Sequence, residues 1–190
     1  STGAMGVALA EQALARGAEV TVVHAHLEVP LPRGVVGIAV STSEEMLSAM
    51  MEAQPANEII LMAAAVADWR SVEVSEQKIQ KSDGLESWEP RLERTRDILQ
   101  ALVGAKRPGQ MIVGFAAETD PDPEVRETTA RKKLVSKKSD AIVLNLVGDQ
   151  VGFGNIETAV TLISASPQSL TFEGTKSSVA GRLLDALPEL

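Results

Sequence analysis

The chain contains 190 residues with 26 acidic and 18 basic side chains, and its formal net charge of −8 argues against a general binder of nucleic acids or anionic membranes. It has no Cys, which excludes disulfides, thiolate metal sites and a Cys nucleophile. Aromatic residues make up only 3% of the chain, so an aliphatic core in one α/β domain fits this length. No apolar run has transmembrane length and no signal peptide is visible, so we expect no membrane segment and a cytoplasmic location.

Helix and strand patterns alternate along most of the chain. Gly17 ends the first helical pattern, Thr42 with Glu45 forms a capping box for the second, and Thr95 is the expected cap of the third. We expect helices over residues 4–16, after Thr42, after Thr95, and over 121–138 and 177–187. We expect strands over residues 19–24, 35–40, 58–65, 110–115 and 141–146, and a terminal hairpin of 159–164 with 170–172. This order predicts an α/β fold with a doubly wound, mostly parallel Rossmann-like sheet, right-handed crossovers and a C-terminal hairpin.

Residues 69–94 interrupt this alternation. They alternate only weakly and contain the turn signal Ser82-Asp83-Gly84, so we expect a small two-stranded excursion with a mobile flap over residues 70–90. Lys78 lies within this segment. Loop lysines are usually solvated, but a lysine that folds over a substrate would suit phosphate chemistry.

Two predicted strands end in small residues that are followed by a polar side chain, at Ala63 to Asp68 and at Gly114 to Thr119. Ligands of doubly wound proteins bind beyond the carboxyl ends of the strands, so these segments indicate a site. Asp68 is either a turn cap or a hydrogen-bonding group for a nucleotide. Phe115 at such a position belongs to the core more often than to a ligand, and Glu118 could ligate a metal or accept a hydrogen bond.

The start of the first helix, Ser1-Thr2-Gly3-Ala4-Met5-Gly6, has two interpretations of about equal weight. Free N–H groups and the helix dipole attract anions at such a place, while a Ser or Thr cap with tightly packed glycines explains the same residues. His24 and His26 lack a third ligand nearby, so we predict no protein metal site.

Basic residues crowd the end of the predicted helix over 121–138, at Arg131, Lys132, Lys133, Lys137 and Lys138. They either complement the helix dipole or bind an anion. Lys133 and Lys137 share one face, and such a like-charge pair is unfavourable unless an anion compensates it. We therefore expect a triphosphate clamp, with both lysines exposed in the free protein.

The chain carries, in this order, the strings Ala63-Ala64-Ala65-Val66-Ala67-Asp68-Trp69-Arg70, Lys78-Ile79-Gln80-Lys81, Gly114-Phe115-Ala116-Ala117-Glu118-Thr119 and Arg131-Lys132-Lys133 with Asp140 and Asn145. Their order and approximate spacing resemble those of bacterial phosphopantothenate–cysteine ligases. The chain resembles that family over essentially its whole length. The first and third strings are specific in combination.

The resemblance implies that residues 1–190 form one nucleotide-binding ligase domain, with its first strand and glycine-rich loop upstream of Ser1. The family activates the carboxylate of 4′-phosphopantothenate with CTP and Mg²⁺ to form an acyl-cytidylate, which the amine of cysteine attacks. It also implies a homodimer, and usually a flavin-containing decarboxylase domain upstream in a bifunctional protein of coenzyme A biosynthesis.

The same resemblance assigns site residues. Lys78 is implied to be catalytic, by stabilising charge on the phosphate in the first half-reaction. Ser1, Thr2 and Gly3 are implied to bind substrate. The implied nucleotide-binding residues are Met62, Ala63, Ala64, Asp68, Arg94, Arg96, Phe115, Lys133 and Lys137.

Departures from the family pattern keep two alternatives open. Ala4 and Gln80 each replace a family Lys, Thr95-Arg96 replaces Asn-Pro, and a family Asn falls two residues before Ser1, so a non-catalytic subunit of the family is one alternative. The other is an NAD(P)- or flavin-dependent oxidoreductase of the Rossmann type. It requires G-x-G-x-x-G and an acidic residue after the second strand, but this chain has only part of the glycine motif and no carboxylate in place.

Overall fold

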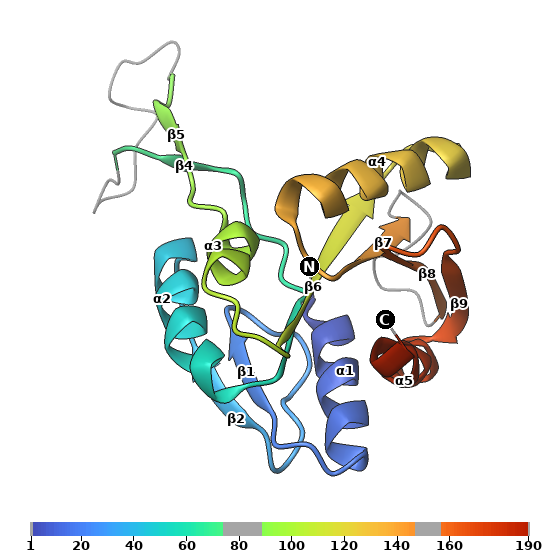
Figure 1. Ribbon diagram of the computed structural model, residues 1–190. Coiled ribbons are helices and arrows are strands. Elements are labelled where there is room, and N and C mark those ends of the chain that lie inside the picture. The colour runs from blue at the N-terminus through green and yellow to red at the C-terminus, as the bar shows by residue number, and fades with distance from the viewer. Residues whose placement is uncertain (1, 74–88, 147–156, 190) are drawn as a thin grey trace.

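The computed structural model describes residues 2–73, 89–146 and 157–189 as an α/β arrangement (Figure 1). The helices are α1 (Ala4–Ala15), α2 (Ser43–Ala53), α3 (Ile98–Gly104), α4 (Pro123–Lys137) and α5 (Lys176–Ala186), with 3-10 turns at Gln54–Ala56 and Leu187–Glu189. The strands are β1 (Thr21–His24), β2 (Val36–Ala39), β3 (Ile59–Met62), β4 (Trp69–Ser71), β5 (Leu92–Arg94), β6 (Met111–Glu118), β7 (Ala141–Leu146), β8 (Glu157–Ser164) and β9 (Leu170–Thr175).

The strands form one main sheet and two separate pairs. The main sheet has the order β3-β6-β7-β8-β9, in which β3, β6 and β7 are parallel and β8 and β9 are antiparallel. β1 and β2 form a parallel pair, and β4 and β5 an antiparallel one. The predicted α/β class, the mostly parallel sheet and the terminal hairpin are confirmed.

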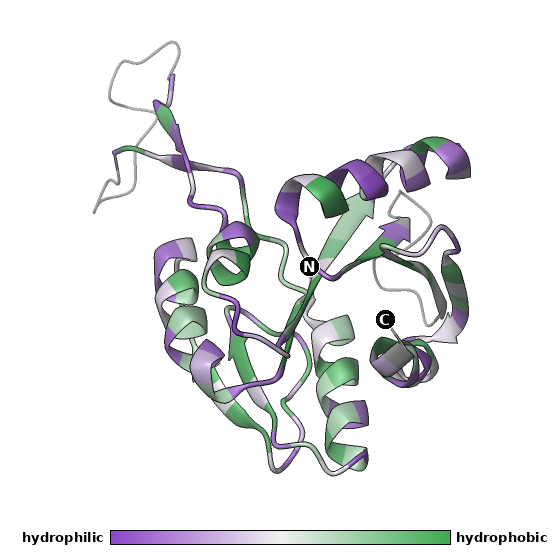
Figure 2. Cartoon of the chain, in the orientation of Figure 1, coloured by the Kyte–Doolittle hydropathy of each residue, from purple (hydrophilic) through white to green (hydrophobic). Residues whose placement is uncertain are grey.

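Helices cover both faces of the main sheet, as a doubly wound fold requires. Alternate residues of a strand point to opposite faces, and the core divides accordingly. Val113 and Val143 point toward α1 and α5, whereas Ile112 points toward α2 and α3 and Ile142 toward α4. Figure 2 shows hydrophobic strands beneath a largely hydrophilic α4. The central strands are therefore buried on both sides.

The first and last helices, α1 and α5, pack against each other on one face of the sheet. Arg16 forms an ion pair of 2.7 Å with Asp185 and donates a hydrogen bond of 3.0 Å to the carbonyl of Gly181. Gln12 donates a hydrogen bond of 3.0 Å to the hydroxyl of Ser177. Polar contacts thus fix one side of a helix pair whose other side is apolar core.

The helix starts agree with the sequence except at α3, and at α4, which begins at Pro123 after the cap Asp122 rather than at residue 121. Thr42 caps α2 by accepting a hydrogen bond of 3.1 Å from the N–H of Glu45, as predicted. The prediction that Thr95 caps α3 is wrong, because Asp97 accepts the hydrogen bond from Gln100 N–H at 2.9 Å. The Thr95 hydroxyl instead donates to the carbonyl of Ala67 at 2.6 Å. The cap lies next to the first helical residue, and Thr95 is two positions too early.

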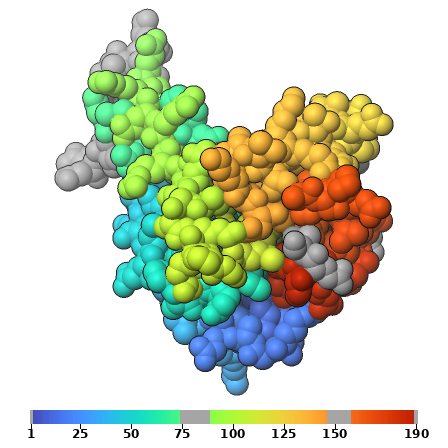
Figure 3. Space-filling model, viewed as in Figure 1, coloured from blue at the N-terminus to red at the C-terminus, as the bar shows by residue number. Residues whose placement is uncertain are grey.

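The expected excursion begins with β4 and ends with β5. These two strands pair with each other and stand away from the body of the molecule (Figures 1 and 3). Most of the expected flap over residues 70–90 lies outside the described residues. No helix in the described ranges is long and apolar enough to span a bilayer.

Candidate functional site

A groove of about 580 Å³ runs along β1 and β3 and continues past their carboxyl ends. We call it the β1–β3 groove. At the carboxyl ends it is lined by Gly3 and Gly6 of α1 and by Met62, Ala63 and Ala64 after β3. Four residues expected to bind nucleotide or substrate from separate parts of the sequence are thus brought together here. The location matches the general rule for ligand sites in doubly wound folds.

Gly3 forms the turn that starts α1. Its φ is +76°, which favours glycine, and a Cβ there would lie 2.2 Å from the Leu27 side chain. The preceding Thr2 accepts hydrogen bonds from Glu28 N–H at 3.1 Å and from Ala4 N–H at 3.4 Å. Gly3 itself gives no side-chain cap, so N–H groups of the first turn remain available to an anion. Ser1 lies outside the described residues.

The segment after β3 offers backbone rather than large side chains. Met62 is 8% exposed and its side chain belongs to the core with α2 and α3, so only its backbone can face a ligand. Ala64 is exposed and small, which permits close approach. Asp68 is also exposed, and its carbonyl accepts a hydrogen bond of 3.0 Å from Thr95 N–H.

The central part of β6 is packed too tightly to admit a ligand. A Cβ on Gly114 would lie 2.6 Å from Leu99 Cδ2 and 2.8 Å from Ile142 Cδ1. Phe115, the next residue, is partly buried and packs against the α1–α5 core together with Ala63. Phe115 is thus a core residue that supports the segment after β3.

Lys133 and Lys137 each form an ion pair with a carboxylate. Lys133 Nζ lies 2.5 Å from a carboxylate oxygen of Glu118 at the end of β6, and Lys137 Nζ contacts the carboxylate of Asp97, the cap of α3. The lysine side chains are 42% and 30% exposed. The expectation of two exposed lysines holds in part, because both side chains stay partly exposed while a carboxylate pairs with each ammonium group.

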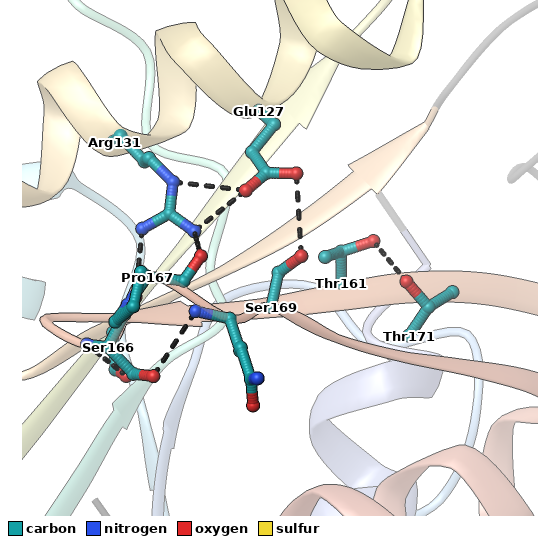
Figure 4. A network of polar contacts seen from close by, with 9 residues as sticks. Glu127, Arg131, Thr161, Ser166, Pro167, Ser169 and Thr171 are labelled. Carbon is teal, nitrogen blue, oxygen red and sulfur yellow. Dashed lines mark hydrogen bonds and ion pairs between the residues drawn. The ribbon is translucent and has the colours of Figure 1, made fainter.

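Arg131 serves a different purpose from the two lysines. Its guanidinium binds Glu127 at 2.7 Å and donates to the carbonyls of Ser166 and Pro167 at 3.0 and 2.8 Å (Figure 4). Glu127 also accepts a hydrogen bond of 3.4 Å from Ser169. These contacts tie α4 to the turn between β8 and β9, so Arg131 is committed to structure.

Arg94 and Arg96 are not brought to the groove. Arg94 lies on β5, with its guanidinium 5.4 Å from the ring centre of Trp69 on β4. Arg96 lies 3.8 Å from Glu44, at the start of α2. Both arginines thus lie on or beside the projecting β4–β5 pair. Lys78 lies outside the described residues.

Asp140 and Asn145, which accompany the family strings, lie at opposite edges of the sheet. Asp140 precedes β7 at the amino edge, where it accepts a hydrogen bond of 2.7 Å from Ile112 N–H and pairs with Lys106. Asn145 lies at the carboxyl edge beside Ala117, and its buried Oδ1 has no hydrogen-bond partner among the described residues. Asp140 is thus structural, and Asn145 lies on the side of the candidate site.

Asp97 was not predicted as a site residue, and Glu118 was predicted as a metal ligand or hydrogen-bond acceptor rather than as the partner of Lys133. An Asp directly before an apolar helical run is a cap signal that could have identified Asp97. Within the described ranges, no group of three or more His, Asp or Glu side chains is arranged to hold a metal ion.

The whole chain, residues 1–190, matches the family model described as the DNA/pantothenate metabolism flavoprotein C-terminal domain. A cysteine/cysteine sulfinic acid decarboxylase from an unknown prokaryotic organism is 38% identical, over 97% of this chain and 50% of its own length. The coenzyme A biosynthesis bifunctional protein CoaBC of Vibrio cholerae is 36% identical, over 100% of this chain and 47% of its own length. This chain therefore spans about half the length of these curated relatives.

A solved structure shows the same fold. The crystal structure of the C-terminal domain of a coenzyme A biosynthesis bifunctional protein CoaBC superposes with a TM-score of 0.79 at 31% sequence identity. The superposition covers 100% of this chain and 83% of that chain.

Proposed function

Because the chain belongs to the family of the DNA/pantothenate metabolism flavoprotein C-terminal domain, we propose that it ligates 4′-phosphopantothenate to cysteine with CTP. The observation that carries this proposal is the match of the entire chain to one half of CoaBC, a protein named for coenzyme A biosynthesis. The geometry supports it, since the helix start at Gly3 and the small residues after β3 share one groove. The decarboxylase name of another relative belongs to a protein of twice this length.

The reaction has two half-reactions. A carboxylate oxygen of 4′-phosphopantothenate attacks the α-phosphorus of CTP, and pyrophosphate leaves with the electron pair of the broken P–O bond. The amine nitrogen of cysteine then attacks the acyl carbon of the acyl-cytidylate, CMP leaves, and the nitrogen loses a proton. Both leaving groups are phosphates, so positioned cations and N–H donors are what the protein must supply.

The proposed nucleotide contacts follow from the groove. The backbone from Met62 to Ala64 lies against cytidine, and the exposed carboxylate of Asp68 accepts hydrogen bonds from the base or ribose. Phe115 supports this segment from the core side. Arg94 and Arg96 contact the nucleotide only if the β4–β5 pair moves toward the body.

Lys133 and Lys137 are proposed to hold the triphosphate by exchanging partners. Each is paired with one carboxylate in the free protein, so each can exchange that oxygen for a phosphate oxygen. The exchange leaves the Glu118 carboxylate, which is only 18% exposed, without its lysine, so a cation that accompanies the nucleotide has to compensate it. Lys78 is proposed, from the family resemblance, to act on the α-phosphate, and Ser1 to bind substrate with Thr2 and Gly3.

Mg²⁺ fits this site as a companion of the nucleotide. Mg²⁺ is usually held by phosphate oxygens, water and one or two carboxylates, and it would neutralise triphosphate charge. Glu118, once released by Lys133, is the neighbouring carboxylate that would complete its coordination. A dedicated site of three protein ligands is not required.

The proposal extends to assembly. The relatives are about twice as long as this chain, which supports a longer polypeptide with a flavin-containing decarboxylase domain upstream. The family resemblance supports a homodimer that completes the phosphopantothenate site across its interface, and a cytoplasmic location.

A product assay that separates the half-reactions tests the function. With CTP and Mg²⁺, pyrophosphate release should require 4′-phosphopantothenate alone, and CMP release should require cysteine as well. In a thermal shift assay, CTP at about 100-fold excess over its Kd should add roughly 2.7 kcal/mol of stability. Equal or greater stabilisation by NADH or FMN would favour the oxidoreductase instead.

A longer protein distinguishes the ligase from the alternative of a non-catalytic family member. A longer protein that restores the residues before Ser1 should couple cysteine to 4′-phosphopantothenate. If that protein binds CTP but forms no product, the chain is a non-catalytic member, and reversion of Ala4 to Lys is the next variant to assay.

A further inference from the structure

The outer side of α4 is exposed along most of its length. The inner side of the helix packs against β6, β7 and β8 through the buried residues Ala130 and Leu134. Figures 1 and 3 show α4 at the surface of the molecule, with its outer side turned away from the main sheet. This side is therefore available to a second molecule.

Four exposed residues form a stripe along the outer side, which we call the α4 stripe. It consists of Val125, Thr128, Lys132 and Val135. These residues are three, four and three positions apart, which is the spacing of the contact residues in a coiled coil. Val125 is 45% exposed and Val135 is 75% exposed. Val is a weaker helix former than Lys or Glu, so helix propensity does not account for Val at such exposed positions.

A shallow hollow on the same side has the outline of a helix-packing hole. It is lined by Thr128, Arg131, Lys132 and Val135, together with Ser136. The first four occupy positions i, i+3, i+4 and i+7 of the helix. Residues placed in this way surround the hole into which a side chain of a facing helix inserts. The shape of the outer side thus suits a second helix.

The exposed charges of α4 are divided between its two halves. Glu124 lies at the start of the helix, and Lys132 and Lys138 lie in its second half and at its end. Within the described ranges, the side chains of these three residues form no ion pair. The helix dipole explains charges in the first and last turns, but Lys132 lies outside both. An acidic half beside a basic half makes the helix complementary to itself when two copies run in opposite directions.

We propose that the α4 stripe binds a second copy of this chain, with the two α4 helices antiparallel around a two-fold axis level with Ala130. Each residue then lies level with the residue that is equally far from Ala130 on the other side in the second copy. Val125 faces Val135 of the second copy, and Thr128 faces Lys132 of the second copy. The symmetry makes each of these contacts occur twice, as in an isologous interface.

The charges select the antiparallel arrangement. Glu124 and Lys138 are two heptads apart, so both lie on the same flank of the α4 stripe. In the antiparallel pair, Glu124 comes within two positions of Lys138 of the second copy, about 3 Å along the helix axis. A parallel pair would instead place Glu124 beside Glu124 and Lys132 beside Lys132, and like charges at such positions are unfavourable.

Nucleotide binding and this contact use different sides of α4. Lys133 and Lys137 reach the carboxylates of Glu118 and Asp97, away from the α4 stripe. The contact therefore leaves the proposed substrate site uncovered, unlike the homodimer proposed above, and it does not depend on the proposed function. One helix pair is smaller than a stable interface, which buries about 1,200–2,000 Å², so we expect weak and transient association.

Cross-linking tests the pairing directly, because the chain has no Cys of its own. Val125→Cys and Val135→Cys proteins are prepared separately, and each is oxidised alone and as a mixture of the two. A disulfide requires Cα atoms about 4.4–6.8 Å apart. In the antiparallel pair, identical positions lie about 15 Å apart along the axis, whereas the two different Cys face each other. Cross-linked dimers should therefore form in the mixture and not in either protein alone, and mass spectrometry should identify the linked peptides.

Charge variants test the complementarity in the same assay. Glu124→Lys should lower the yield of cross-linked dimer, because it brings Lys beside Lys138 of the second copy, and Lys138→Glu in the same chain should restore the yield. All variants lie on the exposed surface, and unchanged Tm values should show that they fold.

Three results would overturn the proposal. The first is the absence of cross-links in the mixture, and the second is a dimer formed as readily by Val125→Cys alone, which indicates a parallel or random contact. The third is loss of the cross-link in a longer protein that includes an upstream domain, because another part of that polypeptide would then cover α4.

Discussion

Asp97 combines two separable roles, and substitution can divide them. One carboxylate oxygen caps α3 through Gln100 N–H at 2.9 Å, and the other pairs with Lys137. Asp97→Asn keeps a capping oxygen and removes the charge, while Asp97→Ala removes both. Losing the cap costs about 1 kcal/mol. The side chains of the ion pair are 34% and 30% exposed, so solvent screening limits the pair to roughly 0–1 kcal/mol.

The two variants should therefore differ in stability and in nucleotide binding. Chemical denaturation should show Asp97→Ala less stable than the parent by about 1–2 kcal/mol, and Asp97→Asn by no more than about 1 kcal/mol. Asp97→Asn also frees Lys137 to bind phosphate. Titration calorimetry should therefore show that CTP binds about 2–5 times more tightly and that CMP binding is unchanged. This factor follows from a gain of less than about 1 kcal/mol, since roughly 1.4 kcal/mol corresponds to a tenfold change in affinity.

A matched control lies at the other end of α4. Asp122 caps that helix through Glu124 N–H at 2.8 Å, and Asp122→Asn should leave CTP affinity unaltered. Unchanged CTP affinity in Asp97→Asn would remove Lys137 from the nucleotide site. Equal stability of Asp97→Ala and Asp97→Asn would show that the cap contributes nothing.

Three more substitutions test the site and its support. Lys133→Ala should weaken the binding of CTP more than that of CMP, since CMP lacks the β- and γ-phosphates. Lys132→Ala, on the exposed side of α4, serves as the control. Equal losses of CTP affinity in both variants, measured by calorimetry, would exclude a phosphate role for Lys133. Gly114→Ala would place Cβ 2.6 and 2.8 Å from two packed methyl groups, and denaturation should show a loss of about 1–3 kcal/mol; a neutral result would mean that the core relaxes there. Gly3→Ala, at a φ of +76° and 2.2 Å from Leu27, should lower Tm and pyrophosphate release together, and wild-type activity would show that this turn does not position substrate.

Local signals in the sequence predicted the elements well because the chemistry of each signal is complete within a few residues. The capping box at Thr42 and the stop at Gly17, whose φ is +84°, both appear as expected. The terminal hairpin was predicted as two short runs, and the structure extends both. Alternation of strands and helices was enough to predict the layers, since only a few topologies satisfy it.

The site was harder to predict because its contacts join distant parts of the chain. Lys133 pairs with Glu118, 15 residues away in the sequence, and Lys137 pairs with Asp97, 40 residues away. No local sequence pattern predicts a contact at either separation. Asp140 stands in a family string, but the direction of β7 places it at the edge away from the site. Sequence patterns can place a residue on an element, but the edge of the sheet that it occupies depends on strand order and direction.

The packing of α1 against α5 has a consequence for biosynthesis. The hydrogen bond between Gln12 and Ser177 cannot form until the ribosome has synthesised the 165 residues that separate them. At about 5–20 residues per second, a ribosome needs on the order of 10–30 s to synthesise this stretch of the chain. During this time the apolar face of α1 that includes Ala8 and Leu9 lacks the helix that covers it. The nascent chain is therefore a natural client for holding chaperones, and slowing translation before α5 should increase its aggregation.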